Sequence, residues 1–124
     1  MASIKVLEGQ VIKAIEGAKI YGDEIIFSCA DGRKYKMYHE QECCEAVEIV
    51  DITGDIEDLL NTPICEALEE VSSVSTEPEH SYGNDEATAT FYTFRPHKGT
   101  VTIRWLGESN GYYSESVDFE ELKQ

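Results

Sequence analysis

The chain has 124 residues, the usual size of one domain, and we expect residues 1–124 to form a single domain. It carries 25 Asp and Glu residues against 10 Lys and Arg residues, a formal net charge of −15 at pH 7. This charge repels the anionic backbone of nucleic acids, which argues against direct DNA or RNA binding, and it attracts basic surfaces and cations.

The first part of the chain predicts one strand followed by a hairpin. Residues 11–20 form the first expected strand, with Gly17 as a bulge. Residues 24–30 and 33–39 flank an Asp31-Gly32 pair, which is a strong hairpin signal. A three-residue loop with Gly32 in the left-handed conformation segregates apolar from polar side chains better than a two-residue loop. The resulting apolar pairs are Phe27 with Tyr35 and Ile25 with Met37.

The middle of the chain predicts three more strands and a short helix. Residues 46–52 alternate well enough for a strand, and residues 55–60 have the acidic first turn that suits a helix. Residues 64–71 and 87–94 are further expected strands, the second being rich in Thr and aromatic residues. Residues 72–86 between them have the composition of a loop.

A second hairpin is expected near the C-terminus, where residues 100–106 and 112–119 surround an Asn110-Gly111 pair. A three-residue loop of residues 109–111 places the apolar side chains on the face that also carries Trp105. The aligned pairs are Ile103 with Val117 and Val101 with Phe119. The sum is a mainly β (α+β) fold, an antiparallel sheet or partly closed barrel of about eight strands built from hairpins, with a short helix.

The densest group of potential metal ligands contains His39, Cys43 and Cys44. Imidazole and thiolate are good zinc ligands, and a turn of the chain between these residues could close them around a structural zinc ion. No CxxC or HxxxH pair supplies the remaining ligands. The alternative is therefore a buried thiol beside a histidine that ends its strand.

The cellular compartment bears on the other cysteines. Residues 1–8 lack the apolar run of a signal peptide and no window approaches a membrane span, so we expect a cytoplasmic protein that makes no membrane contact. Free thiols or metal ligands then take precedence over disulfides. The predicted register puts Cys29 about 20 Å from His39, too far to share a metal, and puts Asp23 opposite His39. The position of Cys65 stays open.

Partner binding is better supported than catalysis. Acidic residues can face a basic partner and tyrosines anchor interfaces, although acidity that only keeps the protein soluble is the alternative. His80 and His97 lie in no recognised catalytic frame and there is no glycine-rich phosphate loop, so we expect a protein that is not an enzyme. The candidate partner-binding residues are Glu66, Glu69, Glu70, Glu77, Glu79, Tyr112 and Tyr113.

The segments YHEQECCEAVEIVDITGDIEDLL and TVTIRWLGESNGYYSESVDFEEL resemble an uncharacterised family of small acidic phage and prophage proteins, over about Asp23 to Leu122. The sequence is also similar to metal-containing anti-CRISPR inhibitors of Cas9. That resemblance implies a zinc site at His39, Cys43 and Cys44. It also implies binding to a host Cas9-type nuclease that hinders loading of target DNA. The alternatives are a zinc-stabilised accessory protein that binds another host or virion protein, and a metal-dependent phage hydrolase.

Overall fold

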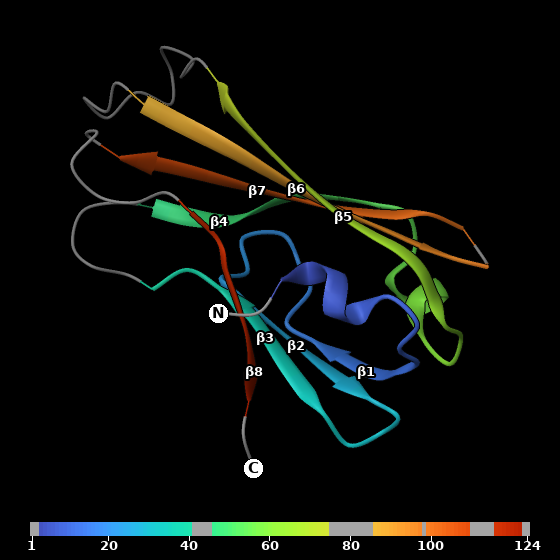
Figure 1. The fold of residues 1–124 in the computed structure, drawn as a ribbon. Coiled ribbons are helices and arrows are strands. Elements are labelled where there is room, and N and C mark those ends of the chain that lie inside the picture. Colours follow the sequence, from blue (N-terminus) through green and yellow to red (C-terminus); the bar gives the residue numbers. More distant parts are fainter. Residues whose placement is uncertain (1–2, 41–45, 75–85, 98, 110–115, 123–124) are drawn as a thin grey trace.

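The computed structural model describes residues 3–40, 46–74, 86–97, 99–109 and 116–122 (Figure 1). These residues form eight strands and two short 3-10 helices. The helices are η1 (Ile4–Leu7) and η2 (Ile56–Leu59). The strands are β1 (Ile12–Glu16), β2 (Glu24–Cys29), β3 (Lys34–Tyr38), β4 (Ala46–Thr53), β5 (Ile64–Val74), β6 (Glu86–Pro96), β7 (Val101–Ser109) and β8 (Asp118–Leu122).

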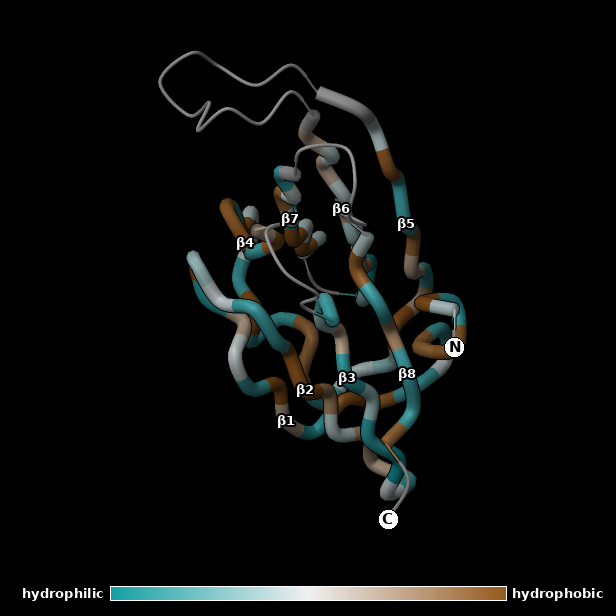
Figure 2. The backbone as a smooth tube through the Cα atoms, turned by 90° about the vertical axis from the view of Figure 1, so that its left-hand side faces the viewer, coloured by the Kyte–Doolittle hydropathy of each residue, from teal (hydrophilic) through white to brown (hydrophobic). Residues whose placement is uncertain are grey.

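The eight strands form two four-stranded antiparallel sheets. Sheet 1 has the order β1-β2-β3-β8 and sheet 2 has the order β4-β7-β6-β5. The long β5–β6 pair of sheet 2 rises beyond sheet 1 (Figure 2). The prediction of a mainly antiparallel β fold is therefore confirmed, with two sheets in the described part of the chain rather than a closed barrel.

The first hairpin, β2–β3, has the predicted register. The paired residues are Phe27 with Tyr35 and Ile25 with Met37. The N–H of Gly32 donates to the carbonyl of Cys29 at 3.1 Å, and Gly32 has φ +94°, in the left-handed region. Local turn chemistry and the alternation of apolar side chains therefore select the three-residue loop together.

The core lies between the two sheets and is built from their apolar faces. Trp105 of sheet 2 is fully buried, and its indole N–H donates to the sulfur of Met37 in sheet 1 at 3.3 Å. The rings of Phe27 and Phe94 join the sheets again, with their centroids 5.9 Å apart. Burial of each such side chain contributes about 1.5–3 kcal/mol, so these contacts hold one sheet against the other.

The elements expected in the middle of the chain are also confirmed. Residues 46–52 lie in β4, residues 64–71 in β5 and residues 87–94 in β6. The short helix is η2, and the Asp55 side chain caps it by accepting a hydrogen bond from the N–H of Glu57 at 3.0 Å.

Strands β5 and β6 extend into residues 72–86, the segment that was expected to be a loop. β5 continues to Val74 and β6 begins at Glu86, while residues 75–85 lie outside the described residues. Cross-strand pairing extends both strands past the point at which their own propensity ends.

The second predicted hairpin is wrong in its pairing. Ile103 of β7 pairs with Tyr92 on one side and Ile52 on the other, while Phe119 of β8 pairs with Met37 in sheet 1. β7 is an interior strand of sheet 2, so both of its edges are taken. Alternation shows which face of a strand is buried but does not identify its neighbour. Residues 110–115, including Asn110-Gly111, lie outside the described residues.

The first strand also differs from its prediction. β1 ends at Glu16, and its bulge lies between Ile12 and Ala14 rather than at Gly17. Gly17 has φ +85° and turns the chain after the strand. Gly17 is therefore a strand terminator, which a glycine in an apolar run signals as readily as a bulge.

No helix in the described ranges has both the length and the apolar character needed to span a bilayer.

Candidate functional site

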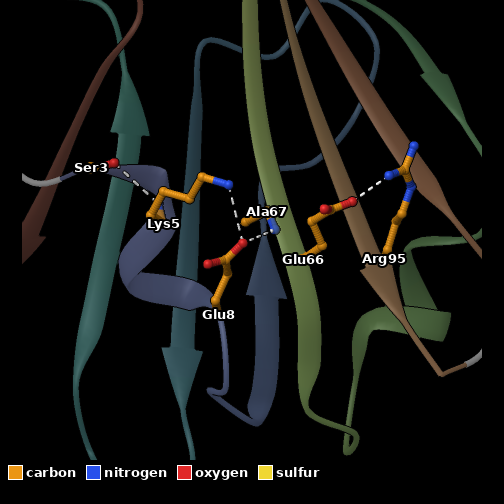
Figure 3. Close-up of polar contacts among 6 residues, drawn as sticks. All are labelled: Ser3, Lys5, Glu8, Glu66, Ala67 and Arg95. Carbon is orange, nitrogen blue, oxygen red and sulfur yellow. Dashed lines mark hydrogen bonds and ion pairs between the residues drawn. The ribbon is translucent and has the colours of Figure 1, made fainter.

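The N-terminal segment is hydrogen-bonded to one end of β5, a strand at the edge of sheet 2. These contacts, made by Lys5, Glu8 and Gly9, are called the clasp below. The Glu8 carboxylate accepts a hydrogen bond from the N–H of Ala67 at 3.0 Å and pairs with the Lys5 ammonium at 3.3 Å (Figure 3). The N–H of Gly9 donates to the carbonyl of Ile64 at 2.7 Å. The Ala67 N–H, and after it Lys5, lower the pKa of Glu8. An acid next to the clasped strand is therefore held in its charged form.

Three of the predicted partner-binding acids lie on β5. Glu66 pairs with Arg95 of β6 (Figure 3). Glu69 and Glu70 are exposed and have no ion-pair partner among the residues that the structure describes. Successive residues of a strand point to opposite faces, so these two acids give both faces of β5 negative charge.

Glu69 also affects a buried neighbour. Tyr92 of β6 is opposite Glu69 and has no exposed surface. Burial first, and then the neighbouring Glu69 carboxylate, raise the pKa of the Tyr92 hydroxyl well above its ordinary value. Tyr92 is therefore a neutral core residue at physiological pH, which excludes it as a general base.

The remaining predicted partner contacts are outside the described residues: Glu77, Glu79, Tyr112 and Tyr113.

The predicted metal group is described only at His39. This residue follows β3 and is half-buried, and its Nδ1 lies 2.7 Å from the carbonyl oxygen of Ser116. Cys43 and Cys44 lie outside the described residues. Among the described residues, no group of three or more His, Cys, Asp or Glu side chains is arranged to hold a metal ion.

The structure brings together a thiol and an imidazole that sequence reasoning treated separately. Cys65 is exposed at the beginning of β5, and its sulfur lies 3.7 Å from Nε2 of His97, just after β6. His97 is exposed. The pairing of Ile64 with Pro96 sets this proximity. The contact between Cys65 and His97 could have been predicted from the sequence by pairing the expected strands 64–71 and 87–94 with each other.

Cys29 has a structural environment. It is buried beside the first hairpin turn, where its N–H donates to the carbonyl of Arg33 at 2.8 Å. Burial raises the pKa of the Cys29 thiol, and Asp31 adds to the effect. A protonated thiol is a poor nucleophile.

Comparison with known families gives one match, a domain of unknown function, DUF7448, which covers residues 8–119. The chain belongs to the DUF7448 family. No curated protein and no solved structure matches the chain. The match begins at Glu8 and ends at Phe119, so it takes in Glu8 and Gly9 of the clasp and all of sheet 2.

Two features stand out in the described part of this DUF7448 protein. Its clearest polar feature is the acidic β5 strand, clasped at one end by the N-terminal segment (Figure 3). The second feature is the thiol–imidazole contact between Cys65 and His97. Both residues are exposed, so water competes with any substrate or ion for binding to these two side chains.

Proposed function

We propose that this DUF7448 protein acts by binding a basic surface of another protein, and that its partner is a host Cas9-type nuclease. The observation that carries the proposal is the net charge of −15 together with two exposed acids on β5, Glu69 and Glu70, for which the described part of the chain supplies no ion-pair partner. Nucleases of this type hold guide and target nucleic acid in positively charged channels. An acidic protein that occupies or covers such a channel hinders target loading without any chemistry of its own.

The negative charge of this protein steers it toward a basic partner, and it affects the association rate more than the affinity. Exposed charges act over about 8 Å at physiological ionic strength, so binding weakens as salt rises. The choice of a Cas9-type partner rests on the resemblance of the sequence to small acidic phage proteins, which the family assignment leaves open.

A structural zinc ion at His39, Cys43 and Cys44 is part of the proposal. The carbonyl of Ser116 lies beside Nδ1 of His39, and metal-ligating histidines commonly make such a contact through one ring nitrogen. Zinc there would tie the end of β3 to the segment that leads into β4, and it would stabilise the fold rather than take part in a reaction.

The test is a cleavage assay with purified nuclease, guide RNA and target DNA. We expect inhibition when the protein is added before the target DNA and little inhibition when it is added afterwards. Unchanged cleavage in either order, at saturating protein and across several nuclease orthologues, would remove the Cas9-type partner. A pull-down from host lysate would then test binding to another host or virion protein.

A charge-matched pair of variants tests the surface itself. Glu69→Gln combined with Glu70→Gln removes two charges from β5, while Glu16→Gln combined with Glu57→Gln removes two exposed charges from other elements. Only the first pair should weaken inhibition if β5 faces the nuclease. Equal weakening by both pairs would show that overall charge, rather than this strand, governs binding.

A further inference from the structure

The two halves of β5 differ in whether another part of the described chain is hydrogen-bonded to their outer edge. β5 is an edge strand, paired with β6 on one side only. At its first half, the outer edge is covered by the N-terminal segment, through Ile64 and Ala67. At its second half, residues 68–74, no strand or loop of the described ranges pairs with the outer edge. This second half is called the free edge below.

The hydrogen bond to Glu8 fixes which backbone groups point outward along the free edge. The N–H of Ala67 points away from β6, because it donates to Glu8. In an antiparallel strand, alternate residues direct both N–H and C=O to the same side. Glu69, Val71 and Ser73 therefore present their N–H and C=O groups outward, while the residues between them bond to β6.

The other edge strand of sheet 2, β4, is bonded on its outer side at Ile49. At β4, the N–H of Ile49 donates to the carbonyl of Gly22 at 2.9 Å, and the Ile49 carbonyl accepts from the N–H of Tyr21 at 2.7 Å. In sheet 1, the N–H of Asn61 donates to the Ile12 carbonyl of β1 at 2.8 Å. Proteins commonly block edges in this way because an open edge is a template for pairing with another strand.

The side chains of the free edge indicate what kind of strand fits it. Val71 is 57% exposed, a large value for an apolar residue in a sheet. Glu69 lies on the same face as Val71, and Glu70 lies on the opposite face; both acids are exposed. An added strand would therefore meet one apolar contact and negative charge on both faces.

We propose that the free edge of β5 binds an extended basic segment of a partner protein by β-strand addition. The outward N–H and C=O groups of Glu69, Val71 and Ser73 supply backbone hydrogen bonds, and Lys or Arg side chains of the segment face Glu69 and Glu70. The part of β5 that carries the free edge lies away from the strands of sheet 1 (Figure 2). This inference deepens the proposed function and rests on it for the choice of a basic partner.

A second copy of the chain is a poor occupant. Two molecules of charge −15 repel each other, and pairing β5 with β5 brings the acids of both copies together. Charge complementarity thus selects a basic segment over self-association.

The test uses a synthetic seven-residue peptide, Val-Lys-Lys-Val-Lys-Lys-Val, acetylated and amidated at its ends, which carries lysines on both faces when it is extended. Titration into isotope-labelled protein, followed by NMR, should move the amide signals of Glu69, Val71 and Ser73 in a saturable way. The same peptide methylated at every backbone nitrogen keeps its charge but has no backbone N–H to donate, so it should not bind. Equal binding of both peptides, or shifts confined to the β8 edge, would overturn the proposal.

Two substitutions at one position separate backbone from side chain. Val71→Pro removes one outward N–H but no bond to β6, and proline is tolerated at such edge positions. Peptide binding should weaken at least about tenfold in Val71→Pro, the effect of losing one hydrogen bond with its neighbouring contacts. Val71→Ala keeps the N–H and should bind within a few-fold of the natural chain. Equal affinity of Val71→Pro and Val71→Ala would refute strand addition, and an unchanged amide spectrum away from β5 checks that Val71→Pro folds.

The nuclease assay distinguishes this inference from the proposed function. If the natural chain and Val71→Pro inhibit cleavage equally, the free edge is not the docking site although the proposed function stands. If the peptide docks on the free edge while no nuclease is inhibited, strand addition stands and the Cas9-type partner does not. Concentration-dependent dimerisation through β5 in sedimentation experiments would refute the basic occupant in favour of a second copy.

Discussion

Two exposed glycines with the same backbone conformation separate the energetic effect of a left-handed residue from that of a steric overlap. Gly32 has φ +94° and Gly17 has φ +85°. A Cβ at Gly32 meets nothing within 4 Å, whereas a Cβ at Gly17 overlaps the backbone carbonyl oxygen of Glu24. Gly32→Ala should therefore reduce the free energy of unfolding by about 1 kcal/mol, the effect of a left-handed alanine alone. Gly17→Ala adds an overlap worth roughly 1–3 kcal/mol more, about 2–4 kcal/mol in all.

Urea denaturation followed by the fluorescence of Trp105, the one tryptophan of the chain, measures both losses. The dependence of the unfolding free energy on urea should stay the same, because neither substitution changes the surface that unfolding exposes. Gly32→Asn is the matched control, since asparagine tolerates the left-handed region, and it should lose less than Gly32→Ala. Equal losses for Gly17→Ala and Gly32→Ala would refute the steric argument, and a neutral Gly32→Ala would refute the turn conformation.

Three further predictions concern the core, the clasp and the metal. Met37→Leu keeps the volume but leaves the buried indole N–H of Trp105 without an acceptor, so urea unfolding should show a loss of about 1–3 kcal/mol, and no loss would contradict that bond. Because the folded-state pKa of Glu8 is lowered, its stabilisation is present above the unfolded-state pKa and is lost as pH falls through the folded-state pKa. The protection factor of the Ala67 amide, which compares its exchange rate with the intrinsic rate at the same pH, should therefore fall on acidification in the natural chain and should be low and nearly independent of pH in Glu8→Ala; identical profiles would count against the clasp. Protein purified without a metal-binding tag should carry about one zinc per chain and lose it in Cys43→Ala, whereas metal-free natural protein would end the zinc proposal.

The part of the fold that the sequence predicted best is the part fixed by neighbouring residues. At the β2–β3 hairpin, Asp31-Gly32 determines the turn, and the alternation of Phe27, Tyr35 and Met37 determines the register. Both signals lie within a few residues of each other, so no distant contact is needed to choose between two-residue and three-residue loops.

The errors lie where the partner of a strand is distant in the chain. β7 and β8 are consecutive strands with a turn-like sequence between them, and yet they belong to different sheets. The apolar side chains of β7 fit against any strand of similar alternation, and β4 and β6 take both of its edges. Sequential strands are neighbours only about two-thirds of the time, so adjacency in the chain is a weak guide to pairing.

The sequence predicted which acidic residues belong to the candidate site, but it did not predict how these residues and the N-terminal segment are arranged around β5. The acids Glu66, Glu69 and Glu70 stand out from the charge pattern, but nothing local indicates that Glu8 bonds to the backbone of Ala67, 59 residues away. That one bond establishes which amides of β5 point outward. The direction of backbone groups at a sheet edge depends on tertiary pairing, and the sequence alone does not contain it in a readable form.

The acidity of the chain bears directly on which strands can pair with the free edge of β5. An exposed strand with Val71 on its surface normally invites copies of the same protein to pair along it. Glu69 and Glu70 place charge on both faces of that strand, so two copies repel, whereas a basic segment is attracted at the same positions. Solubility and partner binding are therefore not competing explanations of the net charge of −15. If a basic segment binds there as we propose, the same acids both disfavour self-association and select the class of strand that pairs with the edge.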